Sequence, residues 1–431
     1  MAISTRAKVP NKSGWMRLAF ALALVMLIGM QTRAFVVMAE PAASESSGDQ
    51  STASNAEAVH VPDVAAESAI LVDGRTGTVL YSKNATEQMY PASITKIVTA
   101  IVALETADVS DIVTVSKAAR WEEGTRVYLE EGEQMSMWQL LLGMMVNSGN
   151  DASTAIADHI DGSKEKFAER MNAFVREHAG AMNSQFRNPH GLPDPDHYTT
   201  AEDMAKIARY AMQNEQFREL VGTKRVNWTG ETWQTSLVNH NKLLGTYEGA
   251  TGIKNGYTTA AGQTLVASAK RGDMEIIGVV LKSPSNQQLY KDMRGLLDYG
   301  FAAFEQKQLF DENEVYHMEG MLNVDYVAEK PIWTIVPKGE EPQLLVDTLG
   351  NIRVLTSHGI SDAGHFLVSR HENEVKMLTT AATVAEPPPA VEEDASNSGG
   401  RTWTLAGTCL LGALAGGTMV YRMRKRNDTS V

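Results

Sequence analysis

The spacing of apolar residues predicts a chain that mixes strands with helices. Short apolar runs bounded by turn residues predict strands at 68–73, 78–81, 264–268 and 274–281. Longer stretches with apolar residues every three or four positions predict helices at 136–145, 152–160, 164–177, 200–213 and 289–305. From 309 to 378 the pattern changes to short strand-like runs, which predicts a small β-rich second domain.

Two further hydrophobic segments lie near the chain ends. Residues 18–30 are apolar or small and follow four basic residues, so 1–39 is predicted to be a signal peptide. Arg33 lies between this segment and the small residues suited to cleavage, which leaves an uncleaved anchor as the alternative.

The second segment, 403–421, carries no charge and is bounded by Trp403 and Tyr421. As a helix it would reach about 28 Å, close to the thickness of a bilayer core. The basic residues that follow place 422–431 in the cytoplasm by the positive-inside rule. We therefore expect a transmembrane helix at 403–421 and the bulk of the chain on the extracellular side of the cell membrane.

Composition divides the remaining chain. Residues 40–63 are rich in Ser, Ala, Gly and acidic residues and predict a disordered linker, and 381–402 combines a Pro run with a Ser/Gly run, which predicts a flexible linker. The expected folded parts are then 64–306 and the β-rich 307–380. The net charge of −13 disfavours nucleic-acid binding, and the single cysteine, Cys409, excludes disulfides and a cysteine nucleophile from these parts.

Ser93 and Lys96 are the first candidates for chemistry. They are three residues apart, so they share one face of a helix. A lysine amine can take a proton from a serine hydroxyl only if burial or nearby cations lower its pKa. Ser-x-x-Lys is therefore a compact unit of nucleophile and base, although the spacing by itself also arises by chance.

Two other motifs supply partners for such a pair. Ser148-Gly149-Asn150 lies at a turn between two predicted helices and offers a hydroxyl and an amide. Lys254-Asn255-Gly256 leads into a predicted strand, where a cation and open backbone could hold a carboxylate and an oxyanion.

In this order and spacing the three motifs resemble those of the penicillin-recognising serine enzymes. Flanking strings narrow the resemblance to the D-alanyl-D-alanine carboxypeptidases, the low-molecular-weight penicillin-binding proteins, over about residues 65–380. These strings are Asp73-Gly-Arg-Thr-Gly-Thr-Val-Leu-Tyr81, Pro91-Ala-Ser-Ile-Thr-Lys-Ile97, Asn150-Asp-Ala152, Asn188-Pro-His-Gly-Leu192, Tyr198-Thr-Thr-Ala-Glu-Asp203, Asn241-Lys-Leu-Leu244 and Leu296-Leu-Asp-Tyr-Gly-Phe301.

The resemblance implies a penicillin-binding, transpeptidase-like domain, in which helices flank an antiparallel sheet. It implies that Ser93 attacks the bond between two D-alanines of a peptidoglycan stem peptide, that Lys96 accepts the serine proton and that Ser148 passes a proton to the leaving amine. Water then frees the acyl-enzyme. β-Lactams would acylate Ser93, and no metal or organic cofactor is implied.

Substrate binding in the resemblance falls to Asn150 and to the segment Lys254, Asn255, Gly256 and Tyr257. The terminal carboxylate lies near Lys254, and the backbone N–H groups of Ser93 and Tyr257 form the oxyanion hole.

Two positions depart from the family pattern. Asn255 stands where threonine is usual, and Leu289, before Tyr290, is read as the slot where an arginine often assists with the carboxylate. These departures are the only support for a weakly catalytic protein that binds wall peptide, and a D,D-endopeptidase is the alternative among the enzymes. A β-lactamase is disfavoured, since no loop with a deacylating glutamate is evident. His190 and Asp203 are interpreted as structural residues that order a loop and brace a helix.

Overall fold

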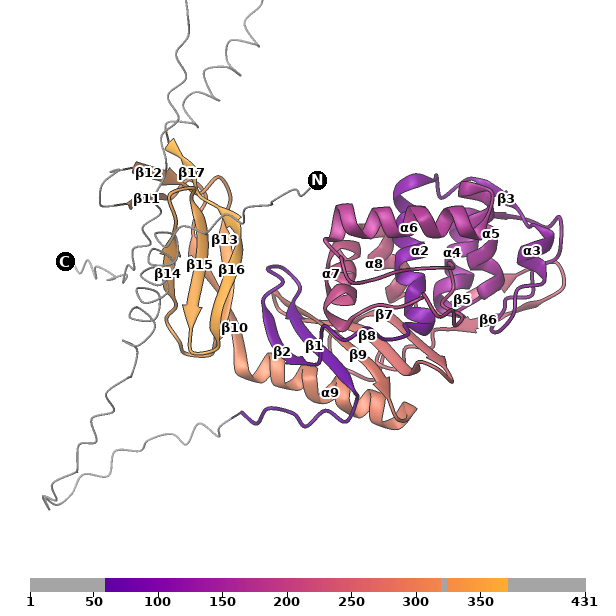
Figure 1. The fold of residues 1–431 in the computed structure, drawn as a ribbon, viewed down its shortest axis with the longest axis horizontal. Coiled ribbons are helices and arrows are strands. Elements are labelled where there is room, and N and C mark those ends of the chain that lie inside the picture. The colour runs from indigo at the N-terminus through magenta and orange to yellow at the C-terminus, as the bar shows by residue number, and fades with distance from the viewer. Residues whose placement is uncertain (1–58, 319–323, 371–431) are drawn as a thin grey trace, which may run out of the picture. The chain divides into compact units, whose positions relative to one another are not determined.

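The computed structural model describes residues 59–318 and 324–370 (Figure 1). A five-stranded antiparallel sheet organises the larger part of it. Its strands are, in spatial order, β2 (Val79–Lys83), β1 (Ser68–Asp73), β9 (Met274–Ser283), β8 (Gly262–Arg271) and β7 (Ala250–Thr258). The strand β7 is an edge of this sheet, so half of its backbone groups have no partner within it.

Helices cover both faces of this sheet. The long α9 (Asn286–Ala303) packs against β8 and β9, and the remaining helices gather on the opposite side (Figure 1). They are η1 (Ala92–Thr95), α2 (Lys96–Thr106), α3 (Lys117–Arg120), α4 (Met137–Val146), α5 (Asn150–Asp161), α6 (Lys164–Ala179), α7 (Ala201–Ala211) and α8 (Glu215–Gly222). A two-stranded sheet of β3 (Ile112–Thr114) with β4 (Gln134–Ser136) and a hairpin of β5 (Arg225–Thr229) with β6 (Gln234–Val238) complete the helical side.

Burial on both faces explains why the central strands read as continuous apolar runs. Neighbouring residues of a strand point to opposite faces. In β9, Ile277 and Val279 join the core beneath α2, α4 and α5, whereas Ile276 and Val280 join the core beneath α9. Both faces must therefore be apolar, which is why simple alternation is absent from 274–281.

A β-rich region follows α9 directly. Its strands are β10 (Phe304–Phe310), β11 (Val315–Met318), β12 (Val324–Val327), β13 (Ile332–Pro337), β14 (Gln343–Val346), β15 (Asn351–Thr356), β16 (Gly359–Phe366) and β17 (Val368–Ser369). Its own apolar cluster includes Phe310, Ile352 and Val354. The expected mixed α/β domain followed by a β-rich region is confirmed.

The predicted helices are all present, with ends displaced by at most three residues. Side-chain caps explain the true beginnings, because Ser136, Ser163, Thr200 and Ser285 each accept a hydrogen bond from the backbone N–H three residues on. The strand pairs β3–β4 and β5–β6 were not predicted from the sequence. Their strands are short and half exposed, and their burial depends on the helices beneath them.

Several predictions fall outside the described residues: the signal peptide 1–39, nearly all of the linker 40–63, the linker 381–402, the transmembrane helix 403–421 and the tail 422–431. Among the residues that are described, no helix combines the length and apolar character needed to span a bilayer.

Candidate active site

Ser93 and Lys96 lie where a short helical turn passes into α2. Ser93 belongs to the 3-10 turn η1. Lys96 is the first residue of α2, and its side chain is fully buried. Lys96 Nζ donates hydrogen bonds to Asn150 Oδ1 at 2.7 Å and to the His190 carbonyl at 2.8 Å, and lies 3.1 Å from Ser93 Oγ. The predicted pair is therefore in direct contact.

This environment disfavours the charged form of the Lys96 amine. Burial lowers the pKa of the amine well below its ordinary 10.5, and the nearby charge of Lys254 lowers it further. A neutral amine has two N–H bonds and one lone pair. Because Asn150 and His190 accept the two N–H bonds, the lone pair is left to face the Ser93 hydroxyl.

The Ser148 motif connects α4 to α5. Ser148 is buried and adopts φ 65°, a left-handed conformation that is unusual for serine and marks a tightly constrained turn. Two residues on, Asn150 begins α5 and is held by the loop 121–133: its N–H donates to the Thr125 carbonyl at 2.7 Å, and its Nδ2 donates to the Glu123 carbonyl at 2.6 Å. This second bond turns Asn150 Oδ1 toward Lys96.

The third motif lies on the edge strand β7, beside Ser93. A Cβ added to Gly256 would lie 2.6 Å from the Ser93 backbone nitrogen, so only glycine allows this approach. Lys254 is buried, and burial lowers its pKa to about 7. Its Nζ donates to the Asn255 carbonyl at 3.1 Å, and Tyr257 is exposed at the outer end of the strand.

A groove of about 600 Å³ begins at Asn255 and Asn147 and extends along the β5–β6 hairpin. Its other lining residues are Trp233, Thr235, Ser236, Leu237, Val238, Asn239, His240, Lys242 and Asn286. The Oδ1 of Asn255 is buried and has no hydrogen-bond partner among the described residues. Asn255 therefore lines the groove while its Oδ1 points away from solvent.

The interpretation of Leu289 as a position at the site is wrong. Leu289 is fully buried in the core between α9 and the sheet, and does not line the groove. The residue of α9 that does is Asn286, at its first turn, where Asn286 Oδ1 accepts from Lys242 Nζ at 2.8 Å. Helix periodicity accounts for the difference, because Leu289 belongs to the same apolar face as Met293 and Leu296.

The turn 188–192 contributes more than the sequence indicated. His190 Nδ1 accepts from the Leu192 N–H at 3.3 Å, which confirms that it orders a loop, but its carbonyl also holds Lys96. Asp203 braces the start of α7 by accepting from Ser184 Oγ at 2.8 Å. Glu122, a buried acid on the loop 121–133, was missed entirely, since nothing in its local sequence distinguishes it.

A serine in contact with a buried lysine of lowered pKa, an adjoining Ser-x-Asn turn and a lysine-bearing edge strand define a serine acyl-transfer enzyme of the penicillin-recognising kind. Residues 55–285 match the D-alanyl-D-alanine carboxypeptidase family. The D-alanyl-D-alanine carboxypeptidase DacF of Bacillus subtilis is 34% identical over 351 residues, covering 78% of this chain and 87% of the relative. DacD of Escherichia coli is 32% identical over 302 residues, covering 66% of this chain and 76% of that protein.

Solved structures agree with this assignment. Penicillin-binding protein 5 of Haemophilus influenzae superposes with a TM-score of 0.61 at 28% identity, over 72% of this chain and 96% of that one. Penicillin-binding protein 6B of Escherichia coli gives 0.58 at 28% identity, over 72% and 95%. The chain belongs to the D-alanyl-D-alanine carboxypeptidase family and is a serine-type D-Ala-D-Ala carboxypeptidase, a penicillin-binding protein.

Gly191 permits a first test of this geometry. It has φ +89°, and an added Cβ would lie 1.9 Å from the carbonyl of Ala92, the residue before Ser93. Gly191→Ala should therefore displace the nucleophile and lower the second-order rate of penicillin acylation by about 100-fold. The rate is measured from the covalent adduct by mass spectrometry.

Gly132→Ala is the matched control. Gly132 has nearly the same φ, +87°, but a Cβ there meets nothing within 4 Å. This variant carries the same backbone strain without the clash. Equal acylation rates for the two variants would contradict the proposed role of close packing at Ser93.

Proposed function

We propose that Ser93, Lys96 and Ser148 carry the carboxypeptidase reaction, and that Asn150 and the segment 254–257 bind the substrate. The observation that carries the proposal is the position of the Lys96 amine. Two neutral acceptors, Asn150 Oδ1 and the His190 carbonyl, hold it so that its lone pair faces Ser93 Oγ. In acylation, Ser93 Oγ attacks the carbonyl carbon of the penultimate D-alanine and its proton passes to Lys96.

The oxyanion formed in this step needs nearby donors. The close approach of Gly256 to the Ser93 nitrogen supports an oxyanion hole made by the N–H groups of Ser93 and Tyr257. Collapse of the tetrahedral intermediate breaks the C–N bond, and the proton held by Lys96 passes through Ser148 to the departing D-alanine amine. Water then hydrolyses the ester and restores Ser93.

The carboxylate of the terminal D-alanine is assigned to Lys254 and Asn255. Lys254 supplies positive charge from below the strand, and the Asn255 amide supplies a donor where the family usually has a threonine hydroxyl. The buried, unpartnered Oδ1 of Asn255 supports an orientation in which Nδ2 faces the groove.

A D,D-endopeptidase is the second candidate. A volume of about 600 Å³ beyond Asn255 is in the range of pockets for drug-sized ligands and exceeds what one D-alanine fills. It supports a larger leaving group, such as the amine side of a cross-linked peptide.

The direct test measures D-alanine release from a stem pentapeptide and cleavage of a cross-linked peptide dimer by the full-length protein. Ser93→Ala should abolish the penicillin adduct and lower D-alanine release by about 10³-fold or more, because the nucleophile is lost. Ser82→Ala, an exposed serine on β2, is the control and should behave as wild type.

The two substrates separate the candidates. Release of D-alanine without cleavage of the dimer would support the carboxypeptidase and exclude the endopeptidase. An unchanged adduct in Ser93→Ala would contradict the assigned nucleophile.

The two lysines also predict a bell-shaped dependence of kcat/KM on pH. Lys96 acts only when neutral, so the rate should rise with pH through its lowered pKa. Lys254 attracts the carboxylate only when protonated, so the rate should fall as the pH passes about 7. D-alanine release measured from about pH 5 to pH 10 would show both limbs.

Lys254→Met isolates the alkaline limb. This variant should be less active, and its rate should no longer fall on the alkaline side. A fall that persists in Lys254→Met would assign that limb to another group.

The location of the enzyme belongs to the proposal as well. The uncharged segment 403–421 and the basic residues after it support an anchor in the cell membrane, with the catalytic domain on the wall side and the tail 422–431 in the cytoplasm.

Deletion of 403–421 should move penicillin-labelled protein from the membrane fraction to the soluble fraction, and deletion of the linker 381–402 should not. Labelled protein that stays with the membrane after the first deletion would instead indicate an anchor at the N-terminal segment.

A further inference from the structure

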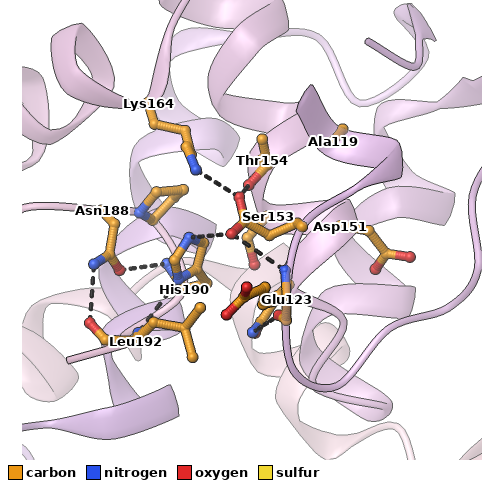
Figure 2. A network of polar contacts seen from close by, with 12 residues as sticks. Ala119, Glu123, Asp151, Ser153, Thr154, Lys164, Asn188, His190 and Leu192 are labelled. Atoms are coloured by element: carbon orange, nitrogen blue, oxygen red, sulfur yellow. Dashed lines mark hydrogen bonds and ion pairs between the residues drawn. The ribbon is translucent and has the colours of Figure 1, made fainter. Parts of the chain in front are cut away.

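A buried acid lies behind the catalytic amine and takes no part in the mechanism described so far. Glu122 is 8% exposed and comes from the loop 121–133. Its Oε2 accepts hydrogen bonds from Thr154 Oγ1 on α5 and from Lys164 Nζ on α6, both at 2.7 Å. Lys164 and Thr154 contact one oxygen of the carboxylate, and His190 lies beside the other (Figure 2). A carboxylate held by two helices in this way is rigid.

The remaining oxygen of Glu122 faces His190. His190 Nδ1 accepts from the Leu192 N–H, so in the neutral ring Nε2 carries the proton. Burial lowers the pKa of His190, which keeps the ring neutral at physiological pH. Nε2 lies 3.4 Å from Glu122 Oε1 and forms no well-aligned hydrogen bond among the described residues. Glu122 Oε1 is thus the carboxylate oxygen that lies beside this N–H.

Both acceptors of the Lys96 amine are tied to this one stretch of chain. The His190 carbonyl belongs to the turn whose side chain contacts Glu122. Asn150 is oriented by the carbonyls of Glu123 and Thr125, which lie one and three residues after Glu122. Glu122 therefore reaches the Lys96 amine through the His190 carbonyl, and the residues that follow it in the same loop hold Asn150.

We propose that Glu122 is a positioning residue for the catalytic base: anchored by Lys164 and Thr154, it fixes His190 and so holds the His190 carbonyl that, with Asn150, keeps Lys96 against Ser93. The proposal rests on the assigned roles of Ser93 and Lys96. Glu122 acts without contacting substrate.

The charge of Glu122 gives the proposal a specific signature. The groups that face Lys96 are Lys254 on β7, which lowers its pKa, and Asp151 on α5 and Glu122, which raise it. His190 and His240 also lie within electrostatic reach, and both have lowered pKa values, that of His240 about 4. Removal of the Glu122 charge therefore lowers the pKa of Lys96.

The experiment measures penicillin acylation of the full-length protein against pH. Glu122→Gln should lower the plateau rate about tenfold, through loss of positioning. It should also move the acid limb about 0.5 pH unit toward lower pH, because the base loses its proton more easily. Glu131→Gln, an exposed acid on the same loop, is the control for the charge change and should leave both unchanged.

A second variant tests the route through His190. His190→Asn keeps an acceptor near the Leu192 N–H but removes the atom that faces Glu122, so its acid limb should stay in place while its rate falls about tenfold. In the double variant the losses should not add, since both act on one carbonyl. This measurement distinguishes positioning from a general loss of stability.

An acid limb that is unchanged in Glu122→Gln, or losses that add in the double variant, would overturn the positioning role. Failure of the wild-type protein to acylate at Ser93 would instead refute the assigned catalytic roles.

Discussion

The site depends on one constraint, the burial of the Lys96 amine among acceptors that carry no charge. An ammonium group removed from water is costly unless it is paired with an anion. The groups that touch Nζ are a serine hydroxyl, an amide oxygen and a backbone carbonyl, so the neutral amine is favoured. The second buried cation, Lys254, adds to this effect.

Holding such an amine requires elements that are far apart in the sequence. The lysine begins α2, one acceptor begins α5, and the other belongs to the turn 188–192. The edge strand β7 adjoins the same point because β8 and β9 are buried on both faces and fix the order of the sheet. The packing of the core and the geometry of the base are therefore parts of one arrangement.

Two glycines allow neighbouring segments to pack closely against the backbone of Ser93 and Ala92 from two sides. Gly191 approaches the carbonyl of Ala92, and Gly256 approaches the nitrogen of Ser93. A side chain at either position would separate the turn η1 from its neighbours. The positive φ of Ala92, 52°, is a further sign of constraint at this point.

Local sequence was a good guide wherever function depends on a short spacing. Ser93 with Lys96, and Ser148 with Asn150, are close in the chain, so helix geometry and the resemblance of their motifs were enough to select them. The role of Leu289 was predicted wrongly because a motif indicates a position in the chain but not the face of the helix on which its side chain lies. Glu122 was missed because its partners, Thr154, Lys164 and His190, lie between 32 and 68 residues away.

The sequence by itself determined the family with its class of chemistry and the mixed α/β architecture, and it selected Ser93 and Lys96 as the candidate pair, since these follow from the resemblance of the motifs, from their spacing and from apolar periodicity. Only the tertiary structure decided which oxygens hold the Lys96 amine, where the groove runs beyond Asn255, and that a buried acid stands behind the base. The physical reason is that hydrogen bonds and electrostatic effects depend on distances in space. Those distances are set when the core packs and leave no trace in the order of residues along the chain.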